Sequence, residues 1–214
     1  MNEQKSTDYL LQNTDVYDRM RLESNPEDMI MKKIIGIAGG TASGKSTFTD
    51  KLAEKLESDG LSVRTIHMDQ FFRPEEDRPH VASHISGKIY VDDNCPDTVD
   101  LEAFREEFDA AAADEKTDVV IAEGLLVLWD ETIKDRLDLR VFVDCAADER
   151  IVRRLRRNME WGLSFDKISA VYLDMVRFRH EQYVEPTKWT ADIIVNGAGD
   201  TSKATNMIAG WIGK

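Results

Sequence analysis

Short apolar runs alternate with amphipathic stretches along most of the chain. The runs predicted to be strands are residues 33–39, 61–67, 118–124, 139–144 and 191–195. The stretches with helical spacing of apolar residues are 44–58, 101–113, 147–160, 165–184 and 201–212. The predicted strands are nearly continuous in apolar residues, which is typical of strands buried on both faces of a parallel sheet. The alternation predicts a doubly wound α/β fold: a parallel five-stranded sheet flanked by helices, with ligands at the carboxyl ends of the strands.

Residues 1–30 do not share this pattern. They are polar and acidic, contain no glycine, and are followed by Met31-Lys32-Lys33 and the first apolar run. We expect an N-terminal extension over 1–30 and one domain over 31–214. The alternatives for the extension are a partner-binding segment and a start site assigned too early.

Composition narrows the classes of partner. The 214 residues carry a formal net charge of −13, which argues against general nucleic-acid binding because that requires clustered Lys and Arg. The most apolar run, 119–129, is too short to span a membrane and contains Glu123. Cys95 and Cys145 lie far apart, which favours a reducing compartment with free thiols. We therefore expect a cytoplasmic protein with no nucleic-acid or membrane partner.

The stretch after the first predicted strand, "GGTASGKST", matches the phosphate-loop pattern G-x-x-x-x-G-K-S/T. Glycines let the backbone wrap around a phosphate, and the amides at the helix start hold the anion. Lys45 is expected to reach the β- and γ-phosphates and Ser46 to bind Mg²⁺. The residues predicted to bind the nucleoside triphosphate are Gly39, Gly40, Thr41, Ala42, Ser43, Gly44, Lys45, Ser46 and Thr47. No N-K-x-D guanine signature occurs in the sequence, so a GTPase is not expected.

Two carboxylates follow predicted strands. Glu123 ends the run "VVIAEG" and Asp69 follows "LSVRTIHM", so a parallel sheet brings both to one crevice. Glu123 is expected to complete the metal site with Ser46; the alternative is a strand-ending residue that faces water. Asp69 is either the polar residue that closes a strand or a group that takes part in the chemistry.

The predicted helix around 148–162 is rich in arginine. On a helix, Arg150, Arg154 and Arg157 share one face. Arginines near a phosphate loop stabilise the charge that develops during phosphoryl transfer, and we expect Arg157 to face the phosphates. The ordinary alternative is a solvated charged face.

Several stretches occur in the order seen in the uridine kinase family: "IIGIAGGTASGKST", "DQFF", "PDTVD", "AEGLLVL", "FVDCAADERIVRRLRR" and "HEQYVEPTKWTADIIV". From Lys33 to its C-terminus the chain resembles this family and the wider phosphoribulokinase-like kinases. The resemblance implies a P-loop fold with a helical lid and an ATP- and Mg²⁺-dependent kinase. The acceptor would be a hydroxyl of a small molecule, typically the 5′-hydroxyl of a nucleoside. Members commonly form homo-oligomers.

The resemblance also implies roles for individual residues. Asp69 matches the catalytic base and Phe72 an aromatic residue of the nucleoside site. Ser46 and Glu123 match the groups beside the metal, and Arg157 matches an arginine of the lid.

The chain departs from the family pattern on the acceptor side. Asn94, in "DNCP", replaces a carboxylate of Y/F-D-H-P that binds ribose hydroxyls, for which Asp92 or Asp93 could substitute. Trp161 and Leu163 stand where two lid arginines are expected. The missing charge could come from a later helix, through Arg177 and Arg179.

Two segments also differ in length or character. Residues 100–123 are too short for the hairpin that closes over the base in uridine kinases, and 75–88 read as a mobile acceptor-side loop. The stretch "DQFFRP" is similar to nicotinamide riboside kinases. Three functions therefore stay open: a nucleoside kinase, a kinase of another ribosyl, sugar or vitamin substrate, and a non-catalytic ATP-binding regulatory protein.

Overall fold

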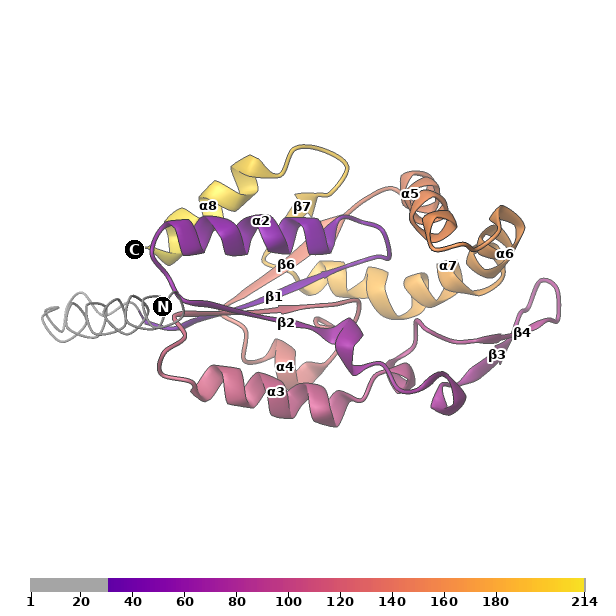
Figure 1. The fold of residues 1–214 in the computed structure, drawn as a ribbon, viewed down its shortest axis with the longest axis horizontal. Helices are drawn as coiled ribbons and strands as arrows, with labels where there is room; N and C mark the ends of the chain where they lie inside the picture. Colours follow the sequence, from indigo (N-terminus) through magenta and orange to yellow (C-terminus); the bar gives the residue numbers. More distant parts are fainter. Residues whose placement is uncertain (1–30, 214) are drawn as a thin grey trace, which may run out of the picture. The chain divides into compact units, whose positions relative to one another are not determined.

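The computed structural model describes residues 31–213, whose central element is a parallel sheet (Figure 1). Its five strands lie in the order β2-β5-β1-β6-β7. They are β1 (Lys33–Gly39), β2 (Val63–His67), β5 (Val119–Glu123), β6 (Leu139–Asp144) and β7 (Ile193–Asn196). Every predicted strand is present, with its ends within two residues of the prediction. The predicted parallel five-stranded sheet is confirmed.

Helices cover both faces of this sheet (Figure 1). On one face lie α2 (Lys45–Ser58) and α8 (Ser202–Ile212), and on the other α3 (Leu101–Ala113) and the short α4 (Glu131–Lys134). Successive residues of β1 belong to the hydrophobic clusters of opposite faces: Ile37 to the cluster that contains Phe48 of α2, and Ala38 to the one that contains Phe104 of α3. All five residues of β5 are buried, which explains why its sequence is continuously apolar. The fold is doubly wound, as predicted.

A long helical segment, 165–190, follows α5 (Ala147–Glu160) and is called the lid helix below. It consists of α6 (Phe165–Val171), a wide π turn (Tyr172–Val176), α7 (Arg177–Arg179), a second wide turn (His180–Val184) and a 3₁₀ end (Glu185–Thr190). The predicted helix over 165–184 is confirmed, with two widened turns that the apolar pattern does not reveal. Figure 1 shows α5 and α6 beyond the carboxyl ends of the strands.

The segment between β2 and α3 holds a hairpin that the sequence does not predict. Strands β3 (His80–Ala82) and β4 (Ile89–Val91) pair antiparallel, and the turn between them closes with the Ser83 N–H donating to the Lys88 carbonyl. The expectation of a loop over 75–88 is therefore wrong for residues 80–82, which form β3, whereas 83–88 form the turn of the hairpin. Strands of three residues are too short for a two-residue period to stand out.

The expected extension, 1–30, lies outside the described residues, so its boundary with the domain stays a prediction. No helix between residues 31 and 213 is long and apolar enough to cross a membrane.

Candidate active site

The phosphate loop joins β1 to α2. Gly44, directly before α2, has a left-handed backbone with φ of 97°. A Cβ atom at Gly39 would lie 2.5 Å from the Val143 carbonyl oxygen, so that position has room only for glycine. No described side chain caps the start of α2, and its first amides are therefore available to an anion. This backbone fits the phosphates of a nucleoside triphosphate.

Glu123, at the carboxyl end of β5, is the meeting point of three polar side chains. Lys45 Nζ lies 3.4 Å from its Oε1, and Ser46 Oγ donates to the same oxygen at 3.3 Å. His67 Nδ1 lies 2.8 Å from Oε2. The carboxylate is only 3% exposed, so these partners compensate for its loss of water. Glu123 does not face bulk water.

His67 is a site residue that sequence reasoning missed. It ends β2 and stands opposite Glu123 in the parallel register of β2 and β5. The sequence shows only that His67 ends the strand before Asp69; its place opposite Glu123 depends on β2 and β5 being neighbours in the sheet.

The oxygens of Ser46 and Glu123 are ligands of the kind that Mg²⁺ prefers. Ser46 Oγ and Glu123 Oε1 lie within hydrogen-bond distance of each other, so one ion could take both. Between residues 31 and 213 no group of three or more His, Cys, Asp or Glu is arranged to hold a metal alone. A magnesium ion here would take its remaining ligands from phosphate and water, as is usual for this ion.

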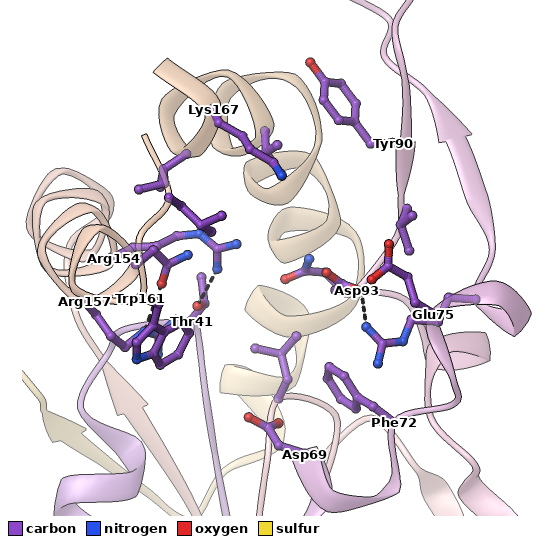
Figure 2. A pocket seen from close by; sticks show the side chains of 18 of the residues that line it. Thr41, Asp69, Phe72, Glu75, Tyr90, Asp93, Arg154, Arg157, Trp161 and Lys167 are labelled. Carbon is purple, nitrogen blue, oxygen red and sulfur yellow. Dashed lines mark hydrogen bonds and ion pairs between the residues drawn. The ribbon is translucent and has the colours of Figure 1, made fainter. Parts of the chain in front are cut away.

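A cavity of about 540 Å³ opens beside the phosphate loop (Figure 2). Lys45 and Thr41 reach it from the loop, and Asp69 and Phe72 reach it from the segment that follows β2. The other predicted residues that line it are Asn94 and Arg157. The structure thus brings the predicted catalytic residues Asp69, Lys45 and Arg157 to one cavity, with Ser46 and Glu123 behind Lys45.

Two arginines of α5 line the same cavity without carboxylate partners among the described residues. Arg154 Nη1 donates to Thr41 Oγ1 at 2.9 Å, and the Arg157 guanidinium lies 5.0 Å from the centre of the Trp161 ring. Burial and the neighbouring Arg157 lower the pKa of Arg154. Burial also lowers the pKa of Arg157, and the charge of Asp69 opposes this. Both guanidinium groups are therefore partly removed from water where they line the cavity, and an anion bound there could pair with them.

Arg150, on the same face of α5, lies against the phosphate loop. Its Nε donates to the Cys145 carbonyl at 3.0 Å, and its Nη1 is buried with no hydrogen-bond partner among residues 31–213. A Cβ atom at Gly40 would lie 2.7 Å from that Nη1. The three arginines expected on one helix face therefore all approach the phosphate loop or its cavity.

The side of the cavity that is expected to hold the acceptor includes Asp93 and Asn94 of the "DDNC" stretch. Asn94 lines the cavity, and its backbone N–H donates to Asp92 Oδ1 at 3.0 Å. Asp92 is completely buried and paired with Arg179, at 2.6 Å. Asp93 lines the cavity and pairs with Arg78 at 2.9 Å (Figure 2). Of the two carboxylates considered as replacements, Asp93 is the one that faces the cavity.

The loop between α5 and α6 contributes apolar side chains in place of the expected arginines. Trp161 and Leu163 both line the cavity. Arg177 and Arg179 are not among the described residues around it. The guanidinium of Arg177 lies 4.7 Å from the centre of the Phe178 ring, and Arg179 is engaged by Asp92.

A phosphate loop on a doubly wound parallel sheet, with Glu123 beside its lysine, defines a P-loop nucleotide-binding protein with a helical lid. The chain belongs to the phosphoribulokinase/uridine kinase family, whose model matches residues 97–204. It is 33% identical over 193 residues to a uridine kinase of Clostridium botulinum, covering 82% of this chain and 93% of that protein. A uridine kinase of Halobacterium salinarum is 33% identical over 201 residues, covering 81% and 84%. The chain is accordingly an ATP-dependent small-molecule kinase.

Solved structures share its fold. A protein of Silicibacter sp. TM1040, assigned as a kinase of a fructose transport system, matches with a TM-score of 0.62 at 19% identity, over 80% of this chain and 92% of its own. A possible uridine kinase of Bacillus stearothermophilus matches with a TM-score of 0.54 at 17% identity, over 88% and 100%. At these identities the likeness concerns the fold alone.

Proposed function

We propose that this protein transfers the γ-phosphoryl group of ATP, with Mg²⁺, to a hydroxyl of a small molecule. The first candidate acceptor is the 5′-hydroxyl of a nucleoside, because curated relatives with 33% identity are uridine kinases. The observation that carries the proposal is the shared cavity: Asp69, Lys45 and Arg157 line one space of about 540 Å³.

The proposed chemistry assigns one task to each group. The acceptor oxygen bonds to the γ-phosphorus, the bond to the β,γ-bridging oxygen breaks, and ADP leaves with that electron pair. Asp69 accepts the proton of the hydroxyl. Lys45 holds the β- and γ-phosphates, while Arg154 and Arg157 stabilise the charge on the transferred group. Mg²⁺, held by Ser46 and Glu123, would neutralise charge on the phosphates.

An aromatic side chain and hydrogen-bonding side chains of the cavity would together hold the acceptor. Phe72 offers a ring face, and the Arg78 guanidinium lies 5.4 Å from the centre of that ring. Asn94 and Asp93 offer hydrogen-bonding groups for hydroxyls. This combination suits a molecule with a flat part and several hydroxyls, such as a ribosyl compound.

Another acceptor of the same class is the second candidate. Helix α3 leads to β5 within residues 101–123, and the described structure has no hairpin there. The acceptor wall therefore differs from the one expected for uridine kinases, which favours other ribosyl compounds such as nicotinamide riboside, or a sugar or vitamin. A non-catalytic ATP-binding role is disfavoured by the joint presence of Lys45, Ser46, Asp69 and Glu123.

A panel assay tests the proposal. ADP release from MgATP is measured with uridine, cytidine, nicotinamide riboside, ribose, fructose and pantothenate, and without any acceptor. We expect at least one compound to raise ADP release well above the acceptor-free rate, and Lys45→Ala to abolish the increase. If no compound raised ADP release above the rate without acceptor, the result would contradict the proposed transfer to a small molecule and favour the regulatory role.

A further inference from the structure

The β3–β4 hairpin is bound to the lid helix at three points along its length. At the tip, Ser86 Oγ donates to Asp174 Oδ2. In β4, the Tyr90 hydroxyl donates to the same carboxylate oxygen at 2.8 Å. At the base, Arg179 Nε donates to Asp92 Oδ2 at 2.6 Å. Two side chains of one helical segment thus hold the tip, the middle and the base of the hairpin.

A small apolar core fills the space between the two elements. It consists of Tyr172, Met175 and Val176, all buried, with Val81 of β3 and Tyr90 of β4 packed against them. Its three central residues belong to the first wide turn of the lid helix, as does Asp174. A widened turn rotates side chains out of the ordinary helical spacing, and such turns often occur at functional sites. Here the turn presents both the carboxylate and the apolar residues to the hairpin.

The same two elements form the outer wall of the cavity, away from Asp69 (Figure 2). Figure 2 shows Tyr90 and Lys167 on the side of the cavity opposite Asp69. From the hairpin and its exit come Tyr90, Val91, Asp93 and Asn94, and from the lid helix Lys167, Ile168 and Val171. A molecule whose hydroxyl reaches Asp69 would meet this wall with its other end.

We propose that the β3–β4 hairpin selects the acceptor and that Asp174 is the positioning residue that holds it over the cavity. This inference rests on the proposed kinase function. The segment between β2 and α3 would then do in this chain what the resemblance assigns, in uridine kinases, to a hairpin in the region of residues 100–123. Asp174 acts through Ser86 and Tyr90, and it does not itself line the cavity.

Hydrogen exchange of the full-length protein, without ligands, tests the positioning role. Asp174→Ala removes the acceptor of two hydrogen bonds. We expect the hairpin amides, such as those of Ser83 and Asp92, to exchange about tenfold faster than in the unaltered protein. The matched control is Asp166→Ala, an exposed carboxylate in the first turn of the same lid helix, for which we expect a change below about twofold.

Steady-state kinetics test the selection role. The probe is uridine, or the panel compound with the highest kcat/KM if that is another. At saturating MgATP, Asp174→Ala is expected to raise the KM of this acceptor about tenfold. The KM of ATP should stay within about twofold, because Asp174 holds Ser86 and Tyr90 of the hairpin rather than the phosphate loop. Tyr90→Phe, which removes one of the two hydrogen bonds, should give a smaller change in the same direction.

Unchanged exchange of residues 80–91 in Asp174→Ala would overturn the positioning role. Faster exchange with an unchanged acceptor KM would overturn the selection role. Failure of the proposed function is distinguishable from both: the unaltered protein would then phosphorylate no compound of the panel, and the basis of the selection claim would fall with it.

Discussion

At the scale of single residues, Glu123 connects the phosphate loop with the end of β2. It contacts Lys45 and Ser46 of the phosphate loop on one side and His67, two positions before Asp69, on the other. A carboxylate buried to this extent is stabilised only if its charge and its oxygens find partners. His67 pairs with Oε2 of Glu123 and thereby orients the carboxylate so that Oε1 is directed toward Ser46. Groups that orient a metal-binding carboxylate affect metal affinity as well as packing.

His67→Phe is therefore expected to raise the Mg²⁺ concentration for half-maximal activity by roughly ten- to a hundredfold. The measurement is ADP release at saturating ATP and acceptor across a magnesium titration. His84→Phe, an exposed histidine at the hairpin turn, is the control and should leave the magnesium requirement unchanged. An unaltered titration curve in His67→Phe would show that His67 only fills space.

At the scale of elements, the lid helix connects regions that are far apart in the sequence. Its first wide turn binds the hairpin through Asp174, and its second begins with His180, which lies against the phosphate loop. A Cβ atom at Gly40 would lie 3.0 Å from His180 Cε1. A shift of the lid helix would therefore change its contacts both with the hairpin and with the phosphate loop.

The second wide turn makes stability depend on pH. Burial and the charge of Arg150 lower the pKa of His180 to about 4, against the opposing influence of Glu185 and Asp144. The unfolded chain, with an ordinary value of 6.5, binds a proton at a higher pH than the folded chain does. Above pH 6.5 the histidine is neutral in both states and does not change the free energy of unfolding. As the pH falls from 6.5 toward 4, only the unfolded chain gains the proton, and the free energy of unfolding decreases.

For this group alone the free energy of unfolding should be roughly 2 kcal/mol lower at pH 5 than at pH 7. Urea unfolding of the unaltered protein and of His180→Gln at both values measures it. In His180→Gln the free energies of unfolding at pH 5 and pH 7 should differ by about that much less, because glutamine does not titrate. An equal pH dependence in both proteins would contradict a buried neutral His180.

The sequence predicts some elements well and others poorly, for physical reasons. The strands β1 and β5 are recognisable because burial on both faces demands continuous apolar residues, and the phosphate loop because its backbone demands Gly39 and Gly44. The hairpin is not recognisable, because its stability comes from tertiary contacts to Asp174 and Arg179 rather than from its own sequence.

The same distinction applies to the predicted site. Asp69 and Glu123 follow from strand ends, since a parallel sheet brings such positions together. His67 requires the register of β2 against β5, which only the strand order reveals. The suggestion that Arg177 and Arg179 supply the missing charge rests on their place in the next predicted helix, whereas the direction of each side chain depends on the widened turns around them.

At the scale of the whole molecule, an acidic protein concentrates arginines at one edge of its sheet. The formal net charge is −13, whereas Arg150, Arg154 and Arg157 gather at the phosphate loop. Such a local positive region within an acidic chain favours binding of a polyphosphate. A cytoplasmic location remains a prediction from the sequence, and a homo-oligomeric state remains an expectation from the resemblance to the family.

Binding at this region should stabilise the entire fold. A non-hydrolysable ATP analogue with Mg²⁺, at about a hundred times its Kd, raises the free energy of unfolding by about 2.7 kcal/mol. For a chain of this size we expect the Tm to rise by roughly 5–10 °C. Thermal unfolding with and without the analogue measures the shift, and Lys45→Ala should remove most of it. A full shift in Lys45→Ala would mean that the analogue binds elsewhere.

The central claim is that Asp69 activates an acceptor hydroxyl for phosphoryl transfer in the cavity it shares with Lys45. Its most direct test is to quantify phosphorylated acceptor and ADP together by mass spectrometry, for the unaltered protein and Asp69→Asn, with Asp97→Asn as an exposed control. We predict equal amounts of both products from the unaltered protein and a kcat lower by roughly 10²–10⁴ in Asp69→Asn, with ATP still bound. Near-full turnover by Asp69→Asn, or ADP formed without phosphorylated acceptor, would contradict the account.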